Sequence, residues 1–99
     1  MNIIIQYVNM DSSESLSQYT TKKLEKLAKK YDWLISCEVF FKQDNNHKEQ
    51  GKICNMELSL PGPRIFATST EKNFEMAVKE TIHDLDIQLK KRKQIYSTH

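Results

Sequence analysis

Residues 34–42 read LISCEVFFK, and their alternation of apolar and polar side chains is the feature from which the fold follows. Successive side chains of a β-strand point to opposite faces of the sheet. The run therefore predicts a strand with one apolar face and one mixed face. The apolar face takes every second residue: Ile35, Cys37, Val39 and Phe41.

Two further strand patterns follow this run. The polar segment QDNNHKEQG at 43–51 is typical of a hairpin loop, and KICNMELSL at 52–60 alternates like the first run. PGP at 61–63 predicts a tight turn, because proline restricts φ and glycine accepts positive φ. RIFATST at 64–70 predicts a short strand that completes an antiparallel meander. The expected inward positions are Cys54, Met56, Leu58, Leu60, Ile65 and Ala67.

Upstream of the meander, the β-branched run at 3–8 predicts another strand. Asp11, Ser12 or Ser13 can cap a helix expected over about 13–31. A second, longer helix is expected over about 71–96. Apolar residues at helical spacing define the inner face of each: Leu16, Thr20, Leu24, Leu27 and Tyr31 in one, and Phe74, Val78, Ile82, Leu85 and Leu89 in the other.

The resulting order, β-α-β-β-β-α, predicts an α+β fold. The β-α-β unit requires a crossover, so its two strands should be parallel. Both helices can then cover one face of a four-stranded mixed sheet, which makes a two-layer sandwich. The 99 residues are 38% hydrophobic, which suits one domain over 1–99 with a single core.

Composition argues against several classes of protein. No apolar run approaches the roughly 20 residues that span a bilayer, and the opening residues lack the features of a signal peptide. We therefore expect a cytoplasmic protein without membrane association. The two cysteines, Cys37 and Cys54, are too few for a disulfide framework or a zinc site. We expect buried free thiols, no metal and no cofactor.

Positive charge is concentrated in two short lysine clusters, at residues 22–30 and 90–93, although the net charge is only +2. On a helix, Lys22, Lys26 and Lys29 lie opposite Leu24 and Leu27. Crowded like charges repel, which suggests a polyanionic partner such as RNA or DNA. An ordinary solvated helix face, with some gain from the helix dipole, is the alternative. The candidate RNA-binding residues are Lys22, Lys23, Lys26, Lys29, Lys30, Lys90, Lys91, Arg92 and Lys93.

Other features carry weaker signals. Ile4, Phe40 and Phe66 are expected on the sheet face away from the helices, where aromatic rings can stack bases or simply be exposed. No spacing places Ser or Cys beside His47, His83 or His99, and the chain has only two glycines, too few for a phosphate loop. We therefore nominate no catalytic residue and expect no enzyme, with a small ribonuclease as an alternative.

Three stretches together resemble a known family: KKLEKLAKKYDWL at 22–34, LPGPRIFA at 60–67 and EKNFEMAVKETIHDLDIQLKKRK at 71–93. In their order and spacing they are similar to the ribosome hibernation promoting factors, also called ribosome-associated inhibitors or the sigma-54 modulation family. The likeness extends from Met1 to about Lys93. The chain looks like the short form of the family, without its C-terminal dimerisation domain.

The resemblance implies a function. Family members occupy the tRNA and mRNA channel of the small ribosomal subunit and inhibit translation in starvation or stationary phase. The implied partner is 16S-type rRNA, in competition with tRNA and mRNA, and the protein is expected to be a monomer off the ribosome. By position, Lys23 and Lys26 match family cations of the first helix, and Lys91 and Lys93 match those of the second. The other candidates extend the same patches.

The chain departs from the family at two places. Asn73, Phe74 and Glu75 replace the D-M-Y opening of the second helix, and Ile87 replaces an arginine. Part of the usual RNA contact of this helix is therefore expected to move to Lys90 and Arg92. A stand-alone double-stranded RNA binder remains an alternative, because α-β-β-β-α is also the order of that domain. Whether ribosomes are held as single particles or dimers, and whether a second factor is needed, stays open.

Overall fold

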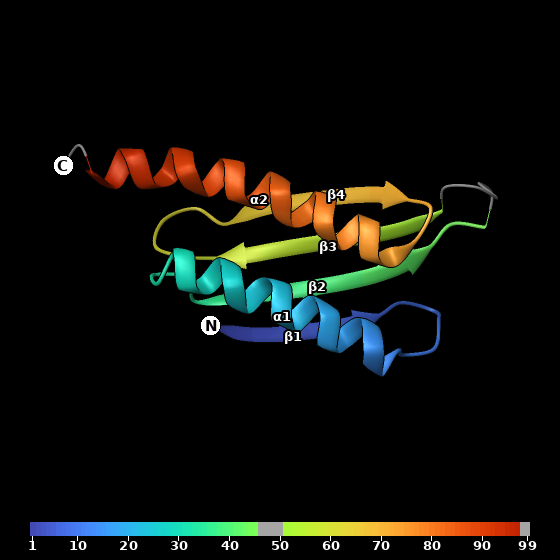
Figure 1. Cartoon of the computed structure of the whole chain (residues 1–99). Helices are drawn as coiled ribbons and strands as arrows, with labels where there is room; N and C mark the ends of the chain where they lie inside the picture. The colour runs from blue at the N-terminus through green and yellow to red at the C-terminus, as the bar shows by residue number, and fades with distance from the viewer. Residues whose placement is uncertain (46–50, 98–99) are drawn as a thin grey trace.

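The structure, a computed structural model, describes residues 1–45 and 51–97. Within these ranges the element order is the expected β-α-β-β-β-α, and the expected α+β fold is confirmed. Figure 1 labels the elements as β1 (Asn2–Tyr7), α1 (Glu14–Lys30), β2 (Ser36–Gln43), β3 (Lys52–Ser59), β4 (Ile65–Glu71) and α2 (Phe74–Ser97).

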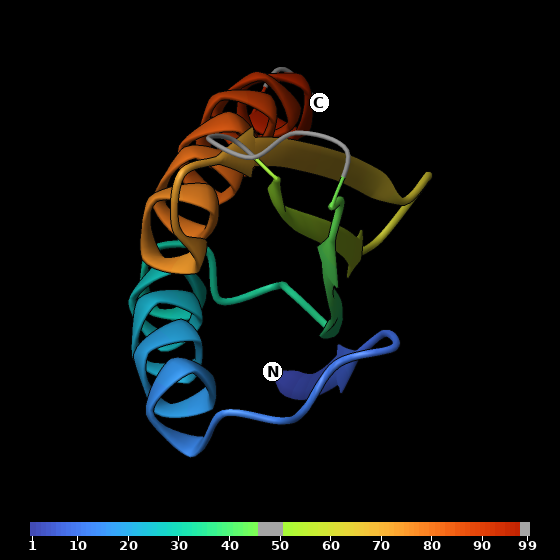
Figure 2. The same cartoon turned by 90° about the vertical axis from the view of Figure 1, so that its right-hand side faces the viewer.

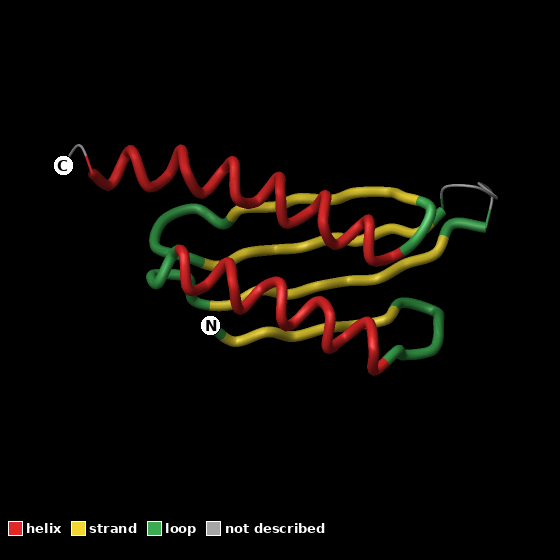
Figure 3. The backbone as a smooth tube through the Cα atoms, in the orientation of Figure 1, coloured by secondary structure: helices red, strands yellow, loops and turns green. Residues whose placement is uncertain are grey.

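The four strands form one sheet in the order β1-β2-β3-β4 (Figure 3). β1 pairs with β2 in parallel, whereas β2, β3 and β4 form the expected antiparallel meander. The backbone amide of Asp44 donates to the carbonyl of Gly51 at 2.8 Å and closes the β2–β3 hairpin. Most of the loop expected at 43–51 lies outside the described residues, as does His47. Gly62 has φ of +96°, which confirms the turn at 61–63.

Both helices cover the same face of the sheet and make the second layer of a sandwich (Figure 2). They start at the same end of the sheet and run in the same direction, and α2 extends beyond the strands (Figure 1). One surface of the molecule is therefore built from two helices side by side. No helix in the described part of the chain is long and apolar enough to cross a membrane.

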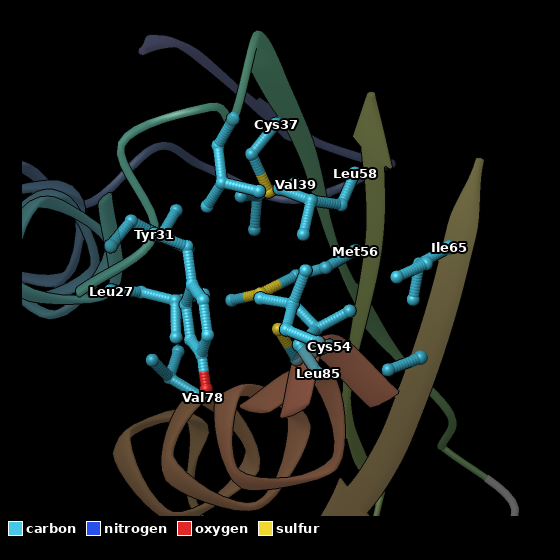
Figure 4. Packing of buried hydrophobic residues seen from close by; sticks show 14 of the residues in the cluster. Leu27, Tyr31, Cys37, Val39, Cys54, Met56, Leu58, Ile65, Val78 and Leu85 are labelled. Carbon is cyan, nitrogen blue, oxygen red and sulfur yellow. The ribbon is translucent and has the colours of Figure 1, made fainter. Parts of the chain in front are cut away.

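The core lies between the helices and the sheet, where β2 and β3 contribute alternate residues (Figure 4). Cys37 and Cys54 are fully buried and free, as expected. The expectation for Ile35 is wrong, because this side chain is 56% exposed. β2 begins one residue later, and Ile35 belongs to the connection, where its amide donates to the carbonyl of Ser59.

The helix starts follow from capping side chains. Ser13 caps α1 by accepting a 3.2 Å hydrogen bond from the amide of Leu16. α2 begins three residues later than expected, because β4 continues to Glu71 and Asn73 accepts a 2.8 Å bond from the amide of Met76. The replacement Asn73 therefore acts as a helix cap.

Candidate nucleic-acid interface

The lysines of α1 lie on the side of the helix away from the sheet. Lys22, Lys26 and Lys29 are exposed, whereas Leu24 and Leu27 are buried, as the helical spacing predicts. Lys23 is half-buried, with its ammonium 5.5 Å from the centre of the Tyr19 ring. That contact leaves the charge at the surface, so the expected basic face of α1 is present.

The cations of α2 are not equivalent. Lys90, Lys91 and Lys93 are exposed, and Arg92 is half-buried. The guanidinium of Arg92 donates to the carbonyl of Pro61 at 3.2 Å and to the carbonyl of Pro63 at 3.0 Å. We conclude that Arg92 anchors the 61–63 turn, because its donors point at backbone carbonyls of the protein itself.

The same turn receives a second anchor from the end of α2. The hydroxyl of Tyr96 donates to the carbonyl of Pro61, and the Tyr96 ring lies edge-on to Trp33 at 5.0 Å between centroids. Arg92 and Tyr96 therefore hold the part of α2 that extends beyond the strands. The cluster that sequence analysis assigned wholly to RNA therefore includes a residue, Arg92, that makes structural contacts within the protein.

Asp86 joins the two lysine clusters. Its carboxylate receives hydrogen bonds from Lys30 at 3.0 Å and from the hydroxyl of Tyr31 at 2.6 Å, both at the end of α1. On α2, Lys90 lies 3.7 Å from the same carboxylate. Two separate segments of the sequence thus meet at one acid, and Lys30 and Lys90 lie on a surface that both helices share.

The environment of Asp86 sets its charge. Burial alone would raise the pKa of Asp86, but hydrogen bonds from Tyr31 and Lys30, with the charges of Lys30 and Lys90, outweigh it and lower the pKa below its ordinary value. Desolvation, followed by the bond to Asp86, raises the pKa of Tyr31 to about 12. At neutral pH the tyrosine is therefore a neutral donor to an ionised carboxylate.

The side chains of the two helices also border a groove of about 540 Å³. Its lining is Lys23, Lys26, Leu27 and Lys30 from α1, with Lys79, Glu80, Ile82, His83 and Asp86 from α2. Sequence analysis did not nominate Lys79, because the same half of the helix also carries Glu75, Glu80, Asp84 and Asp86, which offset its charge. The spacing could have placed Lys79 in the site. Lys79 lies four residues before His83 and seven before Asp86, and residues at these spacings share a helix face.

The open face of the sheet carries the expected apolar side chains. Ile4 and Phe66 are 41% and 62% exposed, and Phe40 is half-buried. Neighbouring polar groups pair with each other: Arg64 donates to Glu57 at 2.5 Å, and Thr68 donates to Asn55. The face is hollowed between Phe40 and Phe66, but it lacks the excess of positive charge found on the helices.

Within the described residues no group of three or more His, Cys, Asp and Glu is placed to hold a metal ion. His83 is exposed on α2, and His99 lies outside the described residues. Burial raises the pKa of both thiols, Cys37 and Cys54, to about 12, and for Cys54 it outweighs a hydrogen bond with Thr81 that lowers the pKa. Within the described residues, exposed cations gather on the two helices, and both thiols are buried.

The chain is similar to known proteins in sequence and in structure. The model of the family described as sigma 54 modulation protein / S30EA ribosomal protein matches residues 3–96. A ribosomal subunit interface protein from Coxiella burnetii has a similar structure, with a TM-score of 0.85 and 28% sequence identity over 95% of this chain and 99% of that chain. The N-terminal domain of Thermus thermophilus Protein Y shares the fold, with a TM-score of 0.78 and 19% identity over 92% of this chain and 98% of that one. No curated protein sequence matches this chain.

Proposed function

Because this chain belongs to the sigma 54 modulation protein / S30EA ribosomal protein family, we propose that it binds the small ribosomal subunit in the tRNA and mRNA channel and inhibits translation in starvation or stationary phase. The family is one of ribosome-associated modulation proteins and is not known as an enzyme family. A ribosomal partner also places the proposed activity in the cytoplasm.

The observation that carries the proposal is the joining of the two lysine clusters at Asp86 into one two-helix surface. Phosphate contacts give affinity and position without reading sequence. A surface of this kind needs a partner whose folded shape supplies the specificity. The 16S-type rRNA of the small subunit is such a partner, and the protein would reach it as a monomer.

The proposed contacts are not uniform across the nine candidate residues. Arg92 is engaged with the 61–63 turn, and Lys30 and Lys90 share the Asp86 carboxylate. The strongest candidates for phosphate contacts are therefore exposed lysines for which no carboxylate partner within 4.0 Å stands in the described part of the chain: Lys22, Lys26, Lys29 and Lys91.

The proposed mechanism is occlusion. A protein that acts by occupying the channel should exclude tRNA from the small subunit, should inhibit in proportion to ribosome number, and should release its hold at high salt. The rRNA should stay uncut. A plain RNA duplex should compete poorly, because it lacks the shape of the channel.

The test is a translation assay with titrated protein, together with binding of labelled tRNA to purified small subunits. The variant Lys23→Glu, Lys26→Glu reverses two charges on α1 and leaves Leu24 and Leu27 in place. We expect it to relieve inhibition and restore tRNA binding. The matched control is Lys42→Glu, Lys72→Glu, which reverses two exposed charges outside the helix surface.

Each outcome has a defined meaning. Simultaneous binding of tRNA and the protein, without mutual effect, would contradict occlusion. Inhibition far below one protein per ribosome, with RNA fragments, would support a ribonuclease. Full competition by a plain duplex would support a general double-stranded RNA binder.

A further inference from the structure

The groove between α1 and α2 contains a lysine, Lys79, that the proposed function leaves unassigned. Lys23, Lys26 and Lys30 follow one another along one wall, and Lys79, His83 and Asp86 follow one another along the other. Each set spans eight residues, a rise of about 10 Å along the helix. The floor includes Leu27, which is buried, and Ile82, which is half-buried.

The two ends of the groove differ in charge. At one end Asp86 takes the hydrogen bonds of Lys30, so positive and negative charge offset each other there. Toward the other end lie Lys23, Lys26 and Lys79, and no ion pair joins any of them to a carboxylate of the described chain. Glu80 is the acid that remains at that end. The balance leaves an excess of positive charge, contributed by both helices.

We propose that this groove is a subsite for the RNA backbone, in which a phosphate of the bound strand lies between Lys23 and Lys26 of α1 and Lys79 of α2. The proposal deepens the proposed function and rests on it. A concave site with cations on both walls holds a phosphate more firmly than a convex helix face, because its contacts converge. Asp86 then closes one end, since its negative charge repels phosphate.

Lys79 is the residue that tests the idea. It lies on α2 outside the 90–93 cluster, is exposed, and makes no ion pair that its removal would break within the described residues. The matched control is Lys72→Ala, which removes an exposed lysine of the same charge just before α2 and outside the groove.

The experiment measures affinity for purified small ribosomal subunits at several salt concentrations. We expect Lys79→Ala to weaken binding and to reduce the magnitude of the slope of log affinity against log salt by about 0.7 to 0.9, the value for one phosphate contact. Lys72→Ala should leave affinity and slope unchanged. Glu80→Gln should strengthen binding, because it removes negative charge from the subsite.

A double-mutant cycle gives a second, independent readout. If Lys26 and Lys79 hold the same phosphate, the loss for the double alanine variant should be smaller than the product of the separate losses. The subsite would be overturned if Lys79→Ala has the affinity and salt slope of the wild type while Lys23→Glu, Lys26→Glu binds more weakly. The proposed function would then still stand. If the α1 variant also binds normally, the proposed function fails at this surface.

Discussion

Arg92→Ala separates a structural contact from an RNA contact within one cluster. Sequence analysis assigned Lys90, Lys91, Arg92 and Lys93 to RNA together. In the structure, Arg92 donates to the carbonyls of both Pro61 and Pro63. The alanine variant should therefore lower stability, whereas Lys91→Ala should not. Arg92→Lys keeps the charge but loses the planar fork that reaches two carbonyls at once.

The magnitude follows from the two hydrogen bonds that Arg92 makes. A hydrogen bond from a charged donor contributes about 1.5–3 kcal/mol when water is excluded. Arg92 is half-buried, so water competes, and we expect a total loss of about 1–2 kcal/mol in the free energy of unfolding. For a domain of this size each kcal/mol lowers Tm by roughly 4–8 °C. The fall in Tm should thus be roughly 4–16 °C. Lys91→Ala should change the free energy of unfolding by less than about 0.5 kcal/mol.

The assay is thermal unfolding by circular dichroism, paired with affinity for purified small subunits over a series of salt concentrations. Arg92→Lys should resemble Arg92→Ala in Tm and the wild type in salt slope. Lys91→Ala should show the reverse, a normal Tm and a shallower slope. Equal Tm values for Arg92→Ala and Lys91→Ala, with reduced affinity for Arg92→Ala, would refute the anchoring role and return Arg92 to the RNA contacts.

Three further predictions follow from the site and its surroundings. If six to eight cations meet phosphates, log affinity for the small subunit should fall with log salt at a slope of roughly −4 to −7, and a slope near zero in the same titration would indicate apolar binding instead. The pKa of Asp86 is lower in the folded protein than its unfolded value of about 3.9, so the ionised carboxylate stabilises the fold above that pH. This contribution should disappear as pH falls below about 4. In denaturant melts over a pH series, the stability of Asp86→Asn should therefore depend less on acid than that of the wild type. Because burial holds the thiol pKa of Cys37 and Cys54 near 12, neither should react with a thiol reagent at pH 8 until denaturant is added, and rapid labelling of the folded protein would show that the core opens.

The fold was largely predictable because its apolar spacing is regular. Alternation in β2 and β3 and the helical spacing of Leu16, Leu24 and Leu27 translate directly into burial. The errors lie at element ends. Ile35 continues the alternation in the sequence, but the strand that would turn it inward has not yet begun. Local pattern alone does not show where a hydrogen-bonded ladder stops.

The site was predictable in its charge and not in its connections. The lysines of α1 are visible as a helical stripe. The bond from Tyr31 to Asp86 joins residues 55 positions apart, and Arg92 reaches a turn about 30 residues earlier. Such partners depend on how the helices pack against each other. A sequence interpreted one helix at a time therefore assigns Arg92 to the partner RNA and leaves Lys79 out.

The parallel pairing of β1 with β2 has a consequence for folding order. The meander of β2, β3 and β4 closes through short connections. β1 pairs with β2 only across the longer connection that contains α1, which brings Asn2 beside Ser36. Closing the longer loop has the larger entropic cost. We therefore expect the isoleucine-rich β1, which is synthesised before β2, to remain an unpaired apolar strand of the nascent chain until β2 has emerged. Slowing translation beyond β1 should prolong that exposed interval, so the protein's own synthesis is most sensitive to delay over residues 8–43.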